Sequence, residues 1–197
     1  GDCLSILGIA REVAAIRGIQ LDQQDASNIP SSIRTKIPIT VDAIQDAPRY
    51  VGRVVKNLHL ANRTPDWMKE RLRRCGLRSI SPIVDITNFV MLELGQPLHA
   101  FDLEAVREGL VVRHSRAGES LVLLDAAEVK LTPGTLIIAN QEKPIGLAGI
   151  MGGQGSGVTT TTQSIFIEAA YFNPEIIRTS AREYGLQTDA SYRFERG

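Results

Sequence analysis

One carboxylate and one imidazole lie in sequence surroundings where ionisable groups are uncommon. Glu168 stands inside the apolar segment IFIEAAYF (165–172), and His99 follows Gly95, a predicted helix stop, on a rigid connection that contains Pro97. Burying a carboxylate without a partner costs on the order of several kcal/mol, so Glu168 is predicted to be a buried acceptor that awaits a donor. Two alternatives remain open: strand alternation could turn Glu168 to solvent, and His99 could be a core histidine bonded to nearby backbone.

The glycine-rich segment GLAGIMGGQGSG (146–157) indicates a close approach between the backbone and another group. It lacks the Lys-Ser/Thr pair of a phosphate loop and the GxGxxG spacing at a strand-to-helix turn, which disfavours a nucleotide-binding loop. Gly152 and Gly153 would instead turn backbone N–H groups toward a ligand, although a tight hairpin with positive φ angles is an equal alternative. Because the chain has no GxSxG elbow and no cysteine in a context for covalent catalysis, any hydrolysis is predicted to use positioned water.

Helix start and stop signals predict the elements that hold these residues. Ser81 can cap a helix that begins with Pro82 and ends before Gly95, just upstream of His99. Three further helices carry similar signals, and the first is predicted to pack through a broad apolar face. They are expected over residues 2–18, 64–76 and 173–184.

The predicted strands place the β-structure mainly in the later part of the chain. β-branched residues predict strands over 39–42 and 50–60, and six short apolar runs separated by turn residues follow between 110 and 169. Helices first, strands later and one returning helix favour an α+β fold over alternating βαβ units. We expect a layered, β-sandwich-like core with helices packed on one side, in three layers. Residues 1–197 would form one compact module, helix-rich over about 1–108 and β-rich over about 109–197.

The charge balance limits what the chain can bind alone. Twenty-two basic residues face twenty-two acidic ones, for a net charge of zero, which is a poor footprint for a domain that holds nucleic acid unaided. One basic cluster, KERLRRCGLR (69–78), could contact phosphate or could simply be a solvated helix face. Most phosphate contacts would therefore come from elsewhere.

Cysteine, histidine and hydropathy patterns exclude several classes of protein. Cys3 and Cys75 form no CxxC pair and are predicted to be reduced and buried. His59, His99 and His114 show no metal-ligand spacing, so no metal site is expected. No apolar stretch approaches the roughly 18 residues of a membrane span, and no signal segment opens the chain, which predicts a cytoplasmic location without membrane contact.

Four segments together resemble the editing module of the beta subunit of bacterial phenylalanyl-tRNA synthetase, its fused third and fourth domains. They are SPIVDITNFVMLELGQPLHAFD (81–102), GLAGIMGGQGSG (146–157), IFIEAAYF (165–172) and TDASYRFERG (188–197), and the resemblance covers essentially the whole chain. It implies an enzyme that hydrolyses tyrosine from wrongly charged phenylalanine tRNA, with His99 and Glu168 as catalytic residues. The resemblance also implies substrate-binding roles for Arg78, Thr87, Asn88, Gly152, Glu168, Thr188 and Ala190.

The resemblance further implies individual roles and partners. Glu168 would accept the tyrosine phenol, His99 would hold the amino-acid end or order the attacking water, and Arg78 would face the terminal adenosine or its phosphate. The partners would be phenylalanine tRNA carrying tyrosine, the remaining beta-subunit domains and the alpha subunit, in a heterotetramer. The module itself would need no cofactor, whereas the parent enzyme would use ATP and magnesium elsewhere. A noncatalytic domain that positions tRNA, and a free-standing relative acting on another aminoacyl-tRNA, remain as alternatives.

Overall fold

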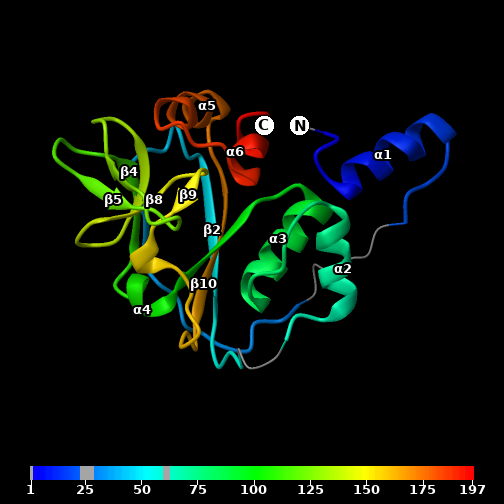
Figure 1. The fold of residues 1–197 in the computed structure, drawn as a ribbon, viewed down its shortest axis with the longest axis horizontal. Coiled ribbons are helices and arrows are strands. Elements are labelled where there is room, and N and C mark those ends of the chain that lie inside the picture. Colours follow the sequence, from blue (N-terminus) through cyan, green and yellow to red (C-terminus); the bar gives the residue numbers. More distant parts are fainter. Residues whose placement is uncertain (1, 23–28, 60–62) are drawn as a thin grey trace.

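Two antiparallel-rich sheets share one core and are flanked by helices (Figure 1). The computed structural model describes residues 2–22, 29–59 and 63–197. The larger sheet has the order β1 (Ile39–Val41), β4 (Leu110–His114), β7 (Leu136–Ala139), β8 (Pro144–Leu147) and β9 (Met151–Gly152), with only β1 and β4 parallel. The second sheet is antiparallel and has the order β2 (Arg49–Val55), β10 (Ile165–Tyr171) and β3 (Leu98–Asp102). Strands β5 (Ser120–Val122) and β6 (Glu128–Lys130) form a hairpin beside them.

The helices cover the outer face of the three-stranded sheet and the ends of both sheets (Figure 1). Helices α2 (Asp66–Arg74) and α3 (Pro82–Leu94) lie on that outer face, where Ile83 packs with Ala100 and Ile165. Short α4 (Leu103–Val106) follows β3, and the 3-10 turn η1 (Gln154–Ser156) follows β9. Helices α5 (Pro174–Glu183) and α6 (Asp189–Phe194) close one end. The predicted α+β class is therefore confirmed.

Strand β10 is the element that organises the site, because it is central in its sheet and covered on both faces. Phe166 and Glu168 point toward the larger sheet, whereas Ile165 and Ile167 point toward α3. Coverage of both faces explains why the sequence of this strand is almost continuously apolar. The five-stranded and the three-stranded sheet both combine strands from before and after residue 108. The predicted division of the chain into a helix-rich and a β-rich part near that residue stays a prediction.

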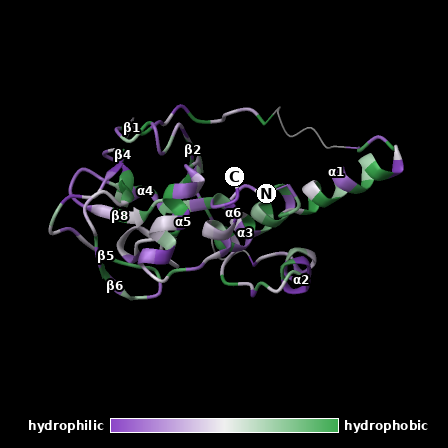
Figure 2. Cartoon of the chain, turned by 90° about the horizontal axis from the view of Figure 1, so that it is seen from above, coloured by the Kyte–Doolittle hydropathy of each residue, from purple (hydrophilic) through white to green (hydrophobic). Residues whose placement is uncertain are grey.

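The first helix differs from its prediction. Helix α1 (Ile6–Arg17) begins after Ser5, whose hydroxyl accepts from the Gly8 N–H at 2.9 Å, so Asp2 is not the cap. The prediction that the apolar face of this helix is packed is also wrong in part, since Ile9 and Val13 are 52% and 50% exposed. Figure 2 shows the reason: α1 extends away from the sheets, which leaves these side chains without a covering element among the described residues.

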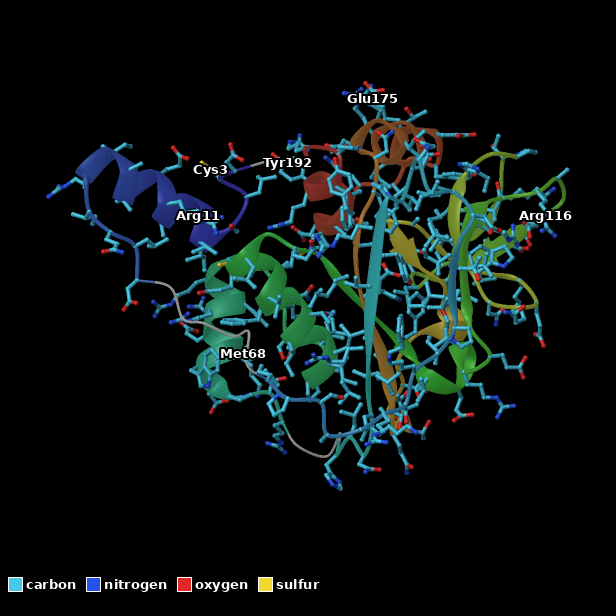
Figure 3. All side chains as sticks on the ribbon, turned by 180° about the vertical axis from the view of Figure 1, so that it is seen from behind. Cys3, Arg11, Met68, Arg116, Glu175 and Tyr192 are labelled. Atoms are coloured by element: carbon cyan, nitrogen blue, oxygen red, sulfur yellow. The ribbon has the colours of Figure 1, made fainter. Side chains whose placement is uncertain are left out.

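Two smaller predictions also need correction. Cys3 and Cys75 are free thiols, as expected, but both are exposed instead of buried. Cys3 precedes α1 on the outer surface (Figure 3), and Cys75 follows the last turn of α2, beyond the buried Leu72. The strand predicted over 50–60 ends at Val55, and its last residue lies outside the described part of the chain.

Asp85 fixes the connection between α2 and α3. Its carboxylate is fully buried and accepts hydrogen bonds from the Thr64 hydroxyl at 2.5 Å, the Ser79 hydroxyl at 2.6 Å and the Ile80 N–H at 2.8 Å. Three donors on one buried carboxylate satisfy most of its acceptor capacity. Asp85 therefore holds the loop on both sides of α2 against the first turn of α3.

Asp85→Ala is expected to lower the free energy of unfolding by about 3 kcal/mol, because it leaves three donors without their acceptor. Chemical denaturation of the purified chain measures the change. Asp66→Ala is the matched control, since the Asp66 side chain is fully exposed and its removal is expected to cost about 0.5 kcal/mol or less. Equal losses in the two variants would contradict the role given to Asp85.

In the described ranges 2–22, 29–59 and 63–197, no helix is long and apolar enough to cross a membrane.

Candidate functional site

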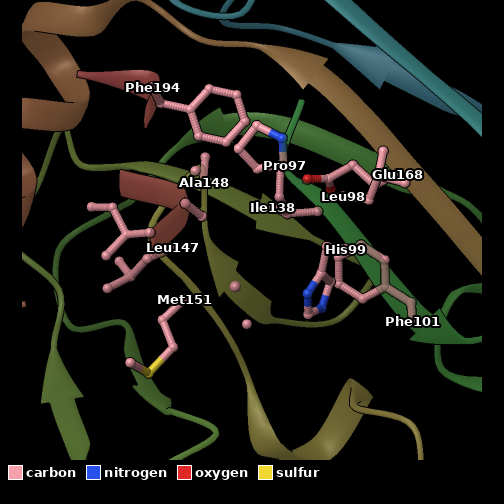
Figure 4. Close-up of a pocket in the computed structure, with 15 residues that line it drawn as sticks. Pro97, Leu98, His99, Phe101, Ile138, Leu147, Ala148, Met151, Glu168 and Phe194 are labelled. Atoms are coloured by element: carbon pink, nitrogen blue, oxygen red, sulfur yellow. The ribbon is translucent and has the colours of Figure 1, made fainter. Parts of the chain in front are cut away.

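A pocket of about 430 Å3, part of it open to solvent, lies between the two sheets where α6 approaches them (Figure 4). Four of the residues singled out in the sequence line it: His99, Gly152, Glu168 and Ala190. The remaining lining is apolar or glycine and comes from β3, β7, β8, the β8–β9 turn and α6. His99 and Glu168 are thus the two titratable groups of the lining.

Strand pairing brings His99 and Glu168 together although 69 positions separate them. In the antiparallel ladder of β3 and β10, His99 lies directly opposite Glu168, and Phe101 opposite Phe166. Directly opposite residues of a ladder share one face of the sheet, with Cβ atoms roughly 5 Å apart. The imidazole and the carboxylate therefore enter the pocket side by side from one rigid wall (Figure 4).

Glu168 is buried, with 7% of its surface exposed, as predicted for an acceptor within an apolar segment. Its Oε2 accepts a hydrogen bond from the Tyr50 hydroxyl at 2.5 Å. Burial raises the pKa of Glu168 to about 7, and the bond from Tyr50 partly opposes that rise because it favours the charged form. Burial and then the neighbouring Glu168 carboxylate raise the pKa of Tyr50 well above its usual value, so Tyr50 stays a donor at neutral pH.

His99 is held by close packing against Phe101 and Gly152. Its ring meets the Phe101 ring edge-on at 4.4 Å between centroids, and a Cβ on Gly152 would come within 2.4 Å of its Cε1. Burial lowers the pKa of His99 to about 4, so the ring is neutral at pH 7. Nε2 is buried and has no hydrogen-bond partner among the described residues. A neutral ring with a free nitrogen can bind a polar group that enters the pocket.

The glycine segment serves close approach, and it does so to the His99 ring. Gly152 has an ordinary backbone angle, whereas the turn before it uses Gly149 with φ of +68°. The positive φ of the hairpin alternative therefore occurs at Gly149, whereas the Gly153 N–H donates to the Ile145 carbonyl at 2.7 Å and is not turned toward a ligand. A side chain at position 152 would displace the imidazole that β3 presents from the other sheet.

Thr188 supports the pocket from behind its wall. Its hydroxyl donates to the Ile150 carbonyl at 2.9 Å and accepts from the Ser191 N–H at 3.0 Å, which caps α6. Ile150 and Ala190 line the pocket, while Thr188 is not in the lining. Thr188 therefore sets the distance between α6 and the β8–β9 turn.

The remaining predicted residues lie outside this pocket. Arg78 is exposed in the connection between α2 and α3, and Asn88 is partly buried on α3. Thr87 is buried on α3 and donates its hydroxyl to the Val84 carbonyl at 2.9 Å. Helix α3 packs on the face of the three-stranded sheet opposite to the pocket. The substrate-binding roles given to these three residues stay predictions.

Several pocket residues carried no sequence signal of their own. Phe101 could have been found two positions after His99, because side chains at i and i+2 of a strand share a face. Phe194 and Tyr50 could not, since they reach the site only through the packing of α6 and the pairing of β2. No group of three or more potential metal ligands gathers in the parts of the chain that the structure describes.

Comparisons with known proteins identify the family of this chain and support its fold. A family model for the B3/4 domain matches residues 46–197. Phenylalanine–tRNA ligase beta subunits from Yersinia pestis and Hahella chejuensis (strain KCTC 2396) are 52% and 54% identical over 196 residues, which is 100% of this chain and 25% of each relative. The chain thus spans about a quarter of the length of these relatives.

A solved structure supports the fold independently. The crystal structure of an N-terminal fragment of the phenylalanyl-tRNA synthetase beta subunit from Pyrococcus horikoshii matches with a TM-score of 0.51 at 16% identity, over 92% of this chain and 57% of that one. The chain therefore belongs to the B3/4 domain family and is similar to a segment of phenylalanine–tRNA ligase beta subunits, which confirms the resemblance predicted from its motifs.

Proposed function

We propose that this domain hydrolyses tyrosine from wrongly charged phenylalanine tRNA. The observation that carries the proposal is the buried Glu168 carboxylate, which faces a pocket of about 430 Å3, part of it open to solvent, whose lining apart from His99 is apolar or glycine. Such a pocket suits an aromatic ring, and its single carboxylate suits a phenol at the end of that ring. Tyrosine differs from phenylalanine by this one hydroxyl.

The discrimination follows from the cost of an unpaired acceptor. A hydrophobic synthetic site cannot strongly reject an analogue that only adds a hydroxyl, whereas a second site built to bind the hydroxyl can reject the analogue without it. Phenylalanine in this pocket would leave Glu168 Oε1 without a donor, since Tyr50 reaches only Oε2, at a cost of about 1–3 kcal/mol. Cognate phenylalanyl-tRNA would therefore escape hydrolysis.

His99 is proposed to order the attacking water. Its pKa of about 4 keeps the ring neutral at physiological pH, so one ring nitrogen can accept a hydrogen bond from water. The water oxygen then attacks the ester carbonyl carbon, the bond between that carbon and the ribose oxygen breaks, and the ribose oxygen takes up the proton that the water loses. No serine, threonine, cysteine or lysine is among the described residues that line the pocket, which fits direct attack by water.

The partners and the cellular location are proposed from the relatives. The domain would act within a complete beta subunit, together with the alpha subunit in a heterotetramer, on phenylalanine tRNA in the cytoplasm. ATP and magnesium would be used at the synthetic site, outside this module.

The test replaces the acceptor in the full ligase. Glu168→Ala is expected to leave phenylalanine charging near normal, while clearance of tyrosyl-tRNA falls at least about tenfold, as the loss of 1.4 kcal/mol or more of substrate binding implies. Deacylation of preformed tyrosyl-tRNA measures the change. Glu175→Ala is the matched control, because Glu175 lies on the outer surface of α5 (Figure 3). Unchanged tyrosine clearance in Glu168→Ala would rule out Glu168 as the acceptor of the phenol, whereas no clearance by the wild-type ligase would favour the noncatalytic tRNA-positioning alternative.

A further inference from the structure

Tyr50 is the closest polar neighbour of the pocket carboxylate, yet it lies outside the pocket lining. In the ladder of β2 and β10 the residue opposite Glu168 is Gly52, and Tyr50 is opposite Ala170, so Tyr50 reaches Glu168 diagonally across one face of the sheet. Its hydroxyl donates to Oε2 at 2.5 Å. Gly52 has no side chain, and the Phe166 ring occupies the space in front of it.

The contact with Tyr50 gives the two oxygens of the Glu168 carboxylate different surroundings. Oε2 is occupied by Tyr50, whereas Oε1 has no hydrogen-bond partner among the described residues. The carboxylate group points toward the pocket (Figure 4). Since each oxygen of a carboxylate can accept separately, a ligand hydroxyl can bind Oε1 while Tyr50 keeps Oε2.

We propose that Tyr50 is a positioning residue, an internal phenol that holds Glu168 Oε2 so that Oε1 faces the cavity, ionised, as the acceptor for a substrate phenol. The identity of the substrate in this inference rests on the proposed function. The hydrogen bond by which Tyr50 positions Glu168 does not depend on that function. Tyr50 thereby acts on specificity without touching the substrate.

The surroundings of Glu168 make Tyr50 the decisive partner for its ionisation. On β3 the facing titratable group is His99, which is neutral because burial lowers its pKa to about 4. Strands β7 to β9, their turns and α6 present only apolar or glycine residues to the pocket. Burial raises the pKa of Glu168 and the Tyr50 hydrogen bond is the opposing contribution, so removing that bond leaves the carboxyl protonated to higher pH.

Tyr50→Phe in the full ligase is the primary test. The phenyl ring keeps the packing, while the pH below which tyrosyl-tRNA clearance falls is expected to move up by about one unit, as loss of a hydrogen bond to a charged group implies. The rate after subtraction of uncatalysed hydrolysis should recover at high pH, which a general structural defect would not allow. Tyr171→Phe is the matched control, because Tyr171 lies on β10 and is 46% exposed.

A direct titration separates this inference from the proposed function. The protonation of Glu168 is followed by infrared difference spectroscopy of the full ligase without tRNA, with Glu168→Gln used to assign the carboxyl band. An upward shift of the midpoint in Tyr50→Phe supports the inference even if the wild type does not deacylate tyrosyl-tRNA, in which case only the proposed function fails. An unchanged midpoint overturns the inference.

A second variant guards against misfolding of Tyr50→Phe. A difluorinated tyrosine at position 50 keeps the shape and donates a stronger hydrogen bond, so it is expected to move the Glu168 midpoint down. A midpoint that does not fall in this variant overturns the inference as well.

Discussion

The Glu168→Gln and His99→Gln variants are expected to show opposite pH dependences of stability between pH 4.5 and 6.5. The folded-state pKa of Glu168 is raised from 4.5 to about 7, so its contribution to stability is complete below 4.5 and is lost as the pH rises through 7. The folded-state pKa of His99 is lowered from 6.5 to about 4, so its contribution is complete above 6.5 and is lost as the pH falls through 4.

In the wild type these two contributions nearly cancel across the shared window, because each shift amounts to about 3 kcal/mol. In Glu168→Gln only the contribution of His99 remains, so the free energy of unfolding rises with pH. In His99→Gln only the contribution of Glu168 remains, so the free energy of unfolding falls as the pH rises. Chemical denaturation of the purified chain at several pH values measures both slopes.

Glu175→Gln serves as the control, since the Glu175 side chain is exposed on α5 and should leave the slope of the wild type unchanged. Slopes of the same sign in Glu168→Gln and His99→Gln would show that burial does not set the two pKa values in opposite directions. The cancellation explains how one apolar pocket can hold two ionisable groups without a strong net dependence of stability on acidity.

Short sequence patterns predicted the features that depend only on residues close together in the chain. Ser81 caps α3 and Gly95 ends it, because a side-chain acceptor and a left-handed residue satisfy helix ends wherever they occur. Glu168 was predicted to be buried because a charged residue in an apolar run must find a partner. These conclusions need no knowledge of distant residues.

Properties set by distant packing could not be predicted. The exposed face of α1 has the same apolar periodicity as a buried one, and only the absence of a covering element among the described residues distinguishes them. Tyr50 lies 118 positions from Glu168, and the pairing of β2 with β10 alone brings them together. Helix α6 was missed because six residues are too few for a periodic pattern, although Thr188 and Ser191 form a capping box.

Ala190→Trp is expected to abolish the clearance of tyrosyl-tRNA while leaving phenylalanine charging intact. Ala190 lies in the first turn of α6 and lines the same pocket as His99 and Glu168. An indole at this position would occupy the space proposed for the substrate ring, and the deacylation rate should fall by about 100-fold or more, because even small misplacement of a reacting group has that effect. The synthetic site would be unaffected, since it lies outside this domain in the proposed enzyme.

Folding must be checked beside activity, since a residue too large for its site costs about 1–3 kcal/mol. Tyr192→Trp is the matched control, because Tyr192 lies on the same helix, is 37% exposed and is not in the pocket lining. A folded Ala190→Trp ligase that clears tyrosyl-tRNA at the wild-type rate would remove the pocket from the proposed reaction. If clearance is lost in Ala190→Trp and kept in Tyr192→Trp, the substrate ring must occupy the space in front of Ala190, and the distance that Thr188 sets between α6 and the β8–β9 turn then limits the size of the amino acid that can be hydrolysed.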